Sequence, residues 1–204
     1  MKYKILFLDF DGIINNEPSL IQRSKLNYNL ELDYISDVPI KPTSDSYNLF
    51  FNEVCWTNLS AIIKCFNQIP NLKIVLSTSW RNMKSLEEWN YQFNLIEGWK
   101  FDIIDKTPQY LNCDKLVNII GGFKSANCRG KEIQYWLDNN KDIVDSYCIL
   151  DDEVDMLIEQ QYNFVQTDLN FGFIESDIDK VLKIFNKEGD FKWIKYNQKK
   201  STYH

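Results

Sequence analysis

Short runs of apolar residues place the strongest constraint on what this chain can fold into. They occupy Tyr3–Leu8, Lys73–Leu76 and Tyr147–Leu150, and a weaker run occupies Phe164–Gln166. The first three runs are largely continuous, whereas a strand with one solvent-exposed face alternates apolar and polar residues. Continuous runs of this length are typical of strands that are buried on both faces of a parallel sheet.

Helical patterns lie between these runs. Apolar residues recur at helical spacing over Glu53–Asn67, Lys131–Leu137 and Ile178–Phe185. Strands that alternate with helices build an open α/β sheet with right-handed crossovers. We therefore expect an α/β, Rossmann-like fold in which helices flank a central, mostly parallel sheet.

Residues 15–52 fit this alternation poorly, because they contain Pro18, Pro39 and Pro42 and lack a clear period. We expect them to form a small cap-like insertion after the first strand. Residues 187–204 are basic and aromatic and form a predicted tail. A length of 204 residues is that of one domain, spanning 1–204.

Composition excludes several kinds of chemistry. The only histidine is the last residue, His204, so we expect neither a Ser-His-Asp triad nor a histidine-ligated zinc site. The five cysteines include no CxxC pair, which favours reduced thiols in a cytoplasmic protein. The net charge of -6 argues against a surface that coats long nucleic acid. No stretch approaches the length of a membrane span.

Side chains that carry oxygen follow each of the three continuous runs. Open α/β sheets bind ligands at the carboxyl ends of their strands, so we expect these side chains at one edge of the sheet. Clustered carboxylates repel one another unless a cation lies among them, and Mg2+ prefers hard oxygen ligands of this kind. The side chains are Asp9 and Asp11 after the first run, Ser77, Thr78 and Ser79 after the second, and Asp151 and Asp152 after the third.

Such a cluster suits phosphoryl transfer. One carboxylate can attack phosphorus to form an acyl-phosphate, and a second can protonate the leaving oxygen and then activate water. The phosphoryl oxygens also need cationic donors. Arg129 opens a predicted helix shortly before the third run, and an arginine at a helix N-terminus is well suited to bind phosphate.

At these positions the chain resembles the haloacid dehalogenase (HAD) superfamily. Phe7–Gly12 (FLDFDG) resembles its first motif and Leu76–Arg81 (LSTSWR) its second, while Arg129-Gly130 resembles the third and Ile149–Asp152 (ILDD) the fourth. A narrower similarity is to the HAD domains of RNA-repair proteins and polynucleotide 3'-phosphatases. It rests on Thr107-Pro108, on the RGKEI and WL of Arg129–Leu137, and on Ile149–Met156 (ILDDEVDM).

The resemblance implies catalytic and metal-binding roles. Asp9 would be the nucleophile and a metal ligand. Asp11 would be the general acid and base, with its backbone carbonyl on the metal. Asp151 and Asp152 would complete the Mg2+ site.

The resemblance also implies phosphate-binding roles. Thr78 would bind the transferring phosphate, with Ser77 or Ser79 as a nearby donor, and Arg129 would neutralise the phosphoryl group. Ser77 could hold the position of Thr78 instead. Arg81 could contact the substrate phosphate or form a structural ion pair.

Two neighbouring residues keep more than one interpretation. Trp80 could belong to the core or could stack on a base. Asp155 could support the metal site or lie on a solvated helix face.

We expect an enzyme, a Mg2+-dependent phosphatase that acts through an aspartyl-phosphate. A short insertion would leave its site open, which suits a nucleic-acid 3'-phosphate end as the partner. Alternatives are a 5'(3')-nucleotidase or other small-molecule phosphatase, a phosphoprotein phosphatase, and a non-catalytic HAD-fold binding module.

Overall fold

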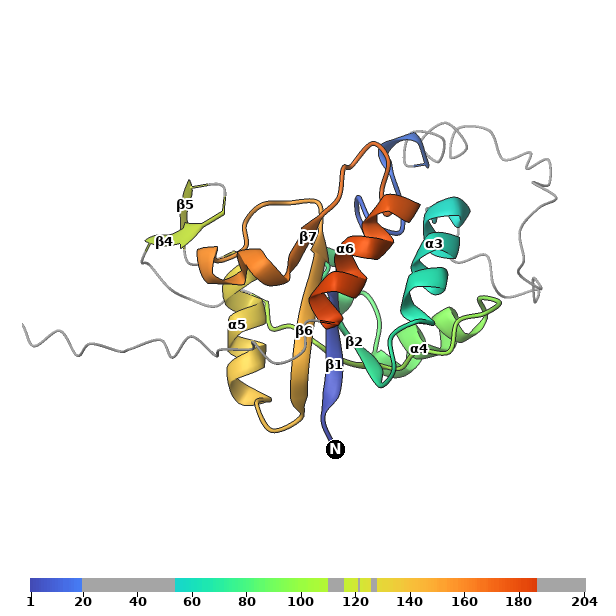
Figure 1. Ribbon diagram of the computed structural model, residues 1–204, viewed down its shortest axis with the longest axis horizontal. Coiled ribbons are helices and arrows are strands. Elements are labelled where there is room, and N and C mark those ends of the chain that lie inside the picture. The colour runs from blue at the N-terminus through green and yellow to red at the C-terminus, as the bar shows by residue number, and fades with distance from the viewer. Residues whose placement is uncertain (20–53, 110–115, 121, 126–127, 187–204) are drawn as a thin grey trace, which may run out of the picture.

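The computed structural model describes residues 1–19, 54–109, 116–120, 122–125 and 128–186 (Figure 1). Most of the predicted insertion, residues 20–52, and the predicted tail, residues 187–204, lie outside the described residues. Within the described part of the chain, no helix has the length and apolar character needed to cross a membrane.

A five-stranded parallel sheet lies at the centre of the structure. Its central strand is β1, whose Phe7 is in register with Val75 on one side and Ile149 on the other. Because β1 is paired along both edges and covered on both faces, Ile5 to Leu8 are fully buried. The order is β3 (Ile103–Lys106), β2 (Leu72–Leu76), β1 (Tyr3–Leu8), β6 (Val144–Asp151) and β7 (Phe164–Gln166).

Helices cover both faces of the sheet, which confirms the predicted Rossmann-like α/β fold (Figure 1). Side chains alternate along β1, so Leu6 and Leu8 pack on one face while Ile5 and Phe7 pack on the other. The first face is covered by α3 (Trp56–Phe66), α4 (Leu86–Asn94) and α6 (Glu175–Phe185), and the second by α5 (Arg129–Asn139).

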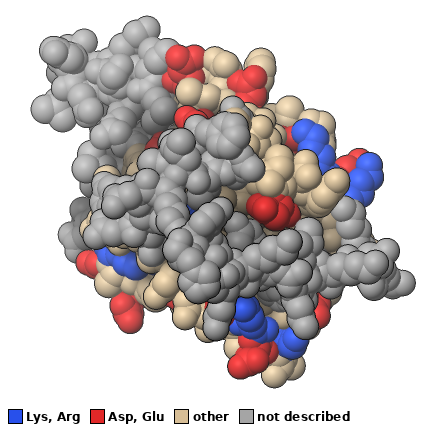
Figure 2. Space-filling model, turned by 90° about the vertical axis from the view of Figure 1, so that its left-hand side faces the viewer, with Lys and Arg blue, Asp and Glu red and all other residues tan. Residues whose placement is uncertain are grey.

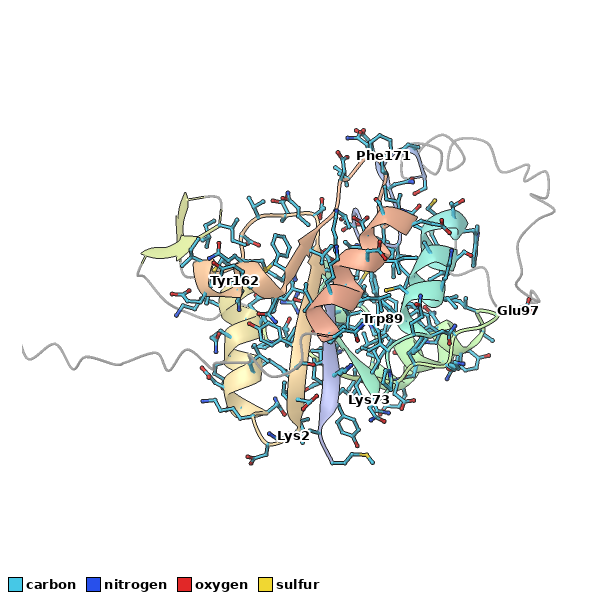
Figure 3. The ribbon with its side chains drawn as sticks, in the orientation of Figure 1. Lys2, Lys73, Trp89, Glu97, Tyr162 and Phe171 are labelled. Atoms are coloured by element: carbon cyan, nitrogen blue, oxygen red, sulfur yellow. The ribbon has the colours of Figure 1, made fainter. Side chains whose placement is uncertain are left out.

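The first of these two cores is rich in aromatic side chains. Trp89 and Phe93 of α4 pack edge-on or tilted around Phe10, with ring centroids 5.2 and 5.8 Å away. Trp89 lies inside the layer between the sheet and its helices (Figure 3). This packing supports the loop that leaves β1, where Asp9 and Asp11 lie.

Smaller elements surround the sheet's carboxyl edge. Two 3-10 helices, η1 (Ser79–Asn82) and η2 (Ile158–Asn163), follow β2 and the loop after β6. An antiparallel hairpin pairs β4 (Leu116–Ile119) with β5 (Gly122–Ser125). Four of the cysteines lie in the described residues, and all four are free thiols, namely Cys55, Cys65, Cys128 and Cys148.

Candidate active site

Sheet pairing continues past the strands and brings their carboxyl ends together. The backbone N–H of Asp9 donates to the carbonyl of Leu150 over 3.1 Å, and that of Ser77 donates to the carbonyl of Leu8 over 2.9 Å. The loops that follow β1, β2 and β6 therefore start side by side. Their polar side chains meet at the carboxyl edge of the sheet, where the positions of the motifs predict them.

Three carboxylates form a cluster at this edge. Asp9, Asp151 and Asp152 each place one carboxylate oxygen within 4.8 Å of the others. Oδ2 of Asp151 is buried and has no hydrogen-bond donor among the described residues. Three close oxygens and an unsatisfied acceptor are the donor set that a hard cation prefers, so these residues fit Mg2+.

Burial makes this cluster electrostatically costly without a cation. Burial raises the pKa of Asp9 and raises that of Asp151 well above its usual value. The negative charge of Asp9 raises the pKa of Asp151 further. Burial, with the Asp9 charge second, raises the pKa of Asp152 to about 6. A divalent cation would favour the ionised forms of all three side chains.

Gly12 allows the loop after β1 to lie against this cluster. Its φ is 65°, in the left-handed region that glycine adopts freely. A Cβ at this position would lie 2.6 Å from Cβ of Asp152, closer than any real contact. A glycine is therefore required at this position of the first motif, because the loop after β1 lies directly against the loop after β6 that carries Asp152.

Arg129 supplies positive charge beside the carboxylates. It is the first residue of α5, and its side chain is 16% exposed. Its guanidinium nitrogens lie 3.5 Å from Asp9 Oδ2, 3.5 Å from Asp151 Oδ2 and 3.9 Å from Glu132 Oε2. Burial alone would lower the pKa of Arg129, but these carboxylates together raise it, so the side chain stays charged.

The loop after β6 holds the start of α5 in place. Asp155 accepts a hydrogen bond of 3.2 Å from the backbone N–H of Arg129, so it lies in this loop and not on a solvated helix face. Gly130 lets the helix pack closely, because a Cβ there would lie 2.3 Å from the backbone nitrogen of Leu157. In the Arg-Gly pair of the third motif, Arg129 thus supplies the cation, and Gly130 allows the helix that carries it to pack closely against the loop after β6.

Of the hydroxyl side chains after β2, Thr78 is the one that lowers the pKa of Asp9, against the larger effect of burial. It is fully buried, and its Oγ1 accepts a hydrogen bond of 3.3 Å from the backbone N–H of Trp80. Ser77 Oγ is buried with no hydrogen-bond partner in the described residues. Ser79 is exposed and, with Arg129, lines a cavity of about 180 Å³. Of the two neighbouring residues, Thr78 is the one whose side chain influences Asp9.

Arg81 links three segments beneath the site. It is 2% exposed and forms an ion pair of 2.7 Å with Glu132. Its other donors bond the carbonyls of Thr78, Thr107 and Pro108 at 2.5, 2.9 and 3.1 Å. Of the two roles open to Arg81, the structure favours the ion pair.

Asp11 does not belong to the carboxylate cluster found among the described residues. Its Oδ2 accepts a hydrogen bond of 3.1 Å from the indole N–H of Trp80, and its Oδ1 accepts one of 2.9 Å from Asn15 Nδ2. Trp80 also packs edge-on against Phe10. Trp80 is therefore part of the core boundary and also contacts a candidate catalytic side chain.

A family model described as the HAD domain in Swiss Army Knife RNA repair proteins matches residues 5–178. The chain belongs to this family. Membership supports a phosphatase of the HAD type. Comparisons with curated proteins and with solved structures found no match.

Three contacts of this HAD domain were not expected from its sequence. They are the bond from Asn15 to Asp11, the bond from Trp80 to Asp11, and the position of Glu132 between two arginines. Glu132 follows Arg129 by three residues, a spacing at which two side chains share one helix face. Asn15 follows Asp11 by four residues in a turn, where asparagine commonly bonds nearby groups.

The raised pKa of Asp152 predicts a pH-dependent gain in stability for Asp152→Asn. Its pKa rises from 3.8 to about 6 on folding, so the folded HAD domain holds the proton more tightly than the unfolded chain. The resulting stabilisation is complete below pH 3.8 and is lost as the pH rises through about 6. We expect the metal-free variant to melt at a higher temperature than wild type above pH about 6, with the gain disappearing near pH 3.8.

Thermal unfolding in the presence of EDTA, followed by circular dichroism across this pH range, measures the effect. Added Mg2+ should raise the melting temperature of wild type and have a much smaller effect on the variant, because a ligand that binds only the folded state stabilises it. A variant that melts below wild type at all pH values would contradict this expectation.

Proposed function

We propose that this HAD domain is a Mg2+-dependent phosphomonoesterase that acts through a phosphoryl group on Asp9. The observation that carries the proposal is the convergence of three groups at one point. Asp9 lies 3.5 Å from the Arg129 guanidinium, is one of the three clustered carboxylates, and has its pKa lowered by the buried Thr78 side chain. A nucleophile, a hydroxyl donor and a cation thus share one site, as phosphoryl transfer requires.

In the first half-reaction, a carboxylate oxygen of Asp9 attacks the phosphorus of the monoester. The bond from phosphorus to the leaving oxygen breaks, and its electron pair stays on that oxygen. The Asp11 carboxyl gives the leaving oxygen a proton. Arg129 and the Thr78 hydroxyl stabilise the charge on the phosphoryl oxygens.

In the second half-reaction, a water molecule attacks the phosphorus of the aspartyl-phosphate, and the Asp11 carboxylate accepts a proton from it. The bond from phosphorus to the Asp9 oxygen breaks, and the electron pair returns to Asp9. Inorganic phosphate is released, and both aspartates recover their starting protonation states.

Asp9, Asp151 and Asp152 would hold Mg2+, with the backbone carbonyl of Asp11 as a further proposed ligand. When bound, Mg2+ supplies positive charge that screens the phosphate from the carboxylates and favours the ionised form of Asp9. Without it, the burial of Asp9 and Asp151 opposes the ionised nucleophile.

The substrate that we propose is a nucleic-acid 3'-phosphate end, with RNA as the first to test. The family takes its description from RNA repair proteins, which supports this choice. The net charge of -6 argues against coating of a long polymer, and recognition of a terminal phosphate would depend on local cations such as Arg129. On the face seen in Figure 2, the described Lys and Arg side chains lie beside Asp and Glu side chains instead of forming one basic area.

Phosphate release with Mg2+ from matched substrates tests this proposal. We expect kcat/KM for an oligoribonucleotide 3'-phosphate to exceed that for 3'- and 5'-mononucleotides by at least about tenfold, a difference of ~1.4 kcal/mol in transition-state binding. EDTA should abolish release.

Preference for mononucleotides would change the assignment to a nucleotidase, and release only from phosphopeptides would indicate a phosphoprotein phosphatase. No release from any substrate would contradict the proposed phosphatase and favour a binding module.

A further inference from the structure

Both carboxylate oxygens of Asp11 are held by side-chain N–H groups. Trp80 Nε1 donates to Oδ2 over 3.1 Å, and Asn15 Nδ2 donates to Oδ1 over 2.9 Å. Both donors are themselves fixed. Asn15 is 3% exposed and accepts a bond of 3.1 Å from the backbone N–H of Gly12, and the Trp80 ring packs on Phe10 at 6.1 Å.

Two such bonds determine how the carboxyl group is turned. The last torsion of an aspartate side chain is broad, so a carboxyl without partners samples many orientations. Each carboxylate oxygen has two lone pairs. One N–H per oxygen therefore fixes the carboxyl plane and still leaves a lone pair on each oxygen for a substrate or a water.

The segment that carries Trp80 also carries the proposed phosphate-binding residue. Trp80 is the second residue of η1, and its backbone N–H donates to Thr78 Oγ1 over 3.3 Å. Thr78 follows Ser77, whose backbone N–H donates to the carbonyl of Leu8, the residue before Asp9. One short turn thus contacts the proposed proton donor and starts beside the strand end that carries the proposed nucleophile.

We propose that Trp80 is a positioning residue for proton transfer, whose indole N–H orients the Asp11 carboxyl toward the leaving oxygen of the substrate. The proposal rests on the proposed phosphatase function and adds a specific role to a residue outside the reacting groups. It replaces base stacking as the function of Trp80. It also gives a physical reason for a tryptophan at this place in the second motif, because an indole offers an N–H at the end of a rigid ring.

The leaving group of the substrate distinguishes positioning from mere structural support. Proton donation matters most for a poor leaving group, such as the alkoxide of an alkyl phosphate, and least for a good one, such as p-nitrophenolate. Trp80→Phe keeps an aromatic ring against Phe10 and removes only the N–H donor. We expect it to lower kcat/KM for an alkyl phosphate by about tenfold, a small part of the full effect of general acid catalysis, and for p-nitrophenyl phosphate by less than about threefold.

Two further variants make the test specific. Trp136→Phe is the matched control, because Trp136 Nε1 donates to Asp105 Oδ2 over 2.6 Å and Asp105 has no part in the proposed site. It should change kcat/KM for both substrates equally and by less than about twofold. Asn15→Leu removes the other donor to Asp11 at similar side-chain volume, and we expect the same selective loss as in Trp80→Phe.

Melting temperatures of all variants, with kcat/KM for both esters, complete the experiment. A selective loss for the alkyl ester in Trp80→Phe and Asn15→Leu supports the positioning role. Equal losses for both esters, or none, would overturn it while leaving the phosphatase intact. A wild-type protein that releases phosphate from neither ester and not from the oligonucleotide 3'-phosphate contradicts the proposed function and this inference with it.

Discussion

Replacing Asp9 by Asn is expected to lower the rate of phosphate release by at least about 10⁴-fold, as in enzymes that lose their nucleophile. An amide cannot form the acyl-phosphate, whereas its shape is that of the carboxylate. Its oxygen can still accept the 2.7 Å bond from the backbone N–H of Phe10. Arg129 keeps Asp151 and Glu132 as partners, so the fold should remain intact.

Steady-state release from the oligonucleotide 3'-phosphate measures this effect. Asp168→Asn is the matched control, because Asp168 is exposed on the loop after β7 and, among the described residues, bonds Asn170 and nearby backbone. We expect the control to keep wild-type activity. Activity of Asp9→Asn within about tenfold of wild type would exclude Asp9 as the nucleophile.

Replacing Arg81 by Leu is expected to lower the free energy of unfolding by about 3–5 kcal/mol, the usual cost of breaking a buried ion pair. The variant loses bonds to three backbone carbonyls and removes the 2.7 Å ion pair of the buried Glu132, whose distance to Arg129 is 3.9 Å. Arg81→Lys should restore only part of the loss, because one ammonium cannot reproduce the planar set of guanidinium donors.

Urea unfolding measures the change in free energy. The control is Lys64→Leu, which breaks a pair of 2.6 Å with Glu175 at the surface, where both side chains are mostly exposed. An exposed pair of this kind contributes much less to stability than a buried one. If Arg81→Leu costs no more than the control, the buried ion pair does not support the site.

Elements with a clear apolar pattern could be predicted from the sequence, including the edge strand β7, and elements without one could not. The bounds of β1 were predicted correctly, because Tyr3–Leu8 is a continuous apolar run at the centre of the sheet. In contrast, β3 was missed, since this edge strand has only two apolar residues before Asp105 and Lys106. Helix α4 was also missed, although the Ser85–Glu88 capping box marks its start.

The site divides in a similar way. Asp9, Thr78 and Asp151 lie at one edge because each follows or ends a strand of the parallel sheet, and this placement could be predicted from the sequence. The contacts of Arg81 and Trp80 could not be predicted, because their partners lie far away in the chain. The Arg81–Glu132 pair spans 51 residues and the Trp80–Asp11 bond spans 69, so each depends on how the elements pack.

A covalent phosphoryl group on Asp9 is the most direct sign of the proposed chemistry. Wild-type protein is mixed with an oligonucleotide that carries a radiolabelled 3'-phosphate, quenched in acid within the first turnover, digested and mapped by mass spectrometry. We predict label on the peptide that contains Asp9, and none in Asp9→Asn. Turnover with no label on Asp9, or with label on a hydroxyl such as that of Thr78, would contradict the aspartyl-phosphate mechanism.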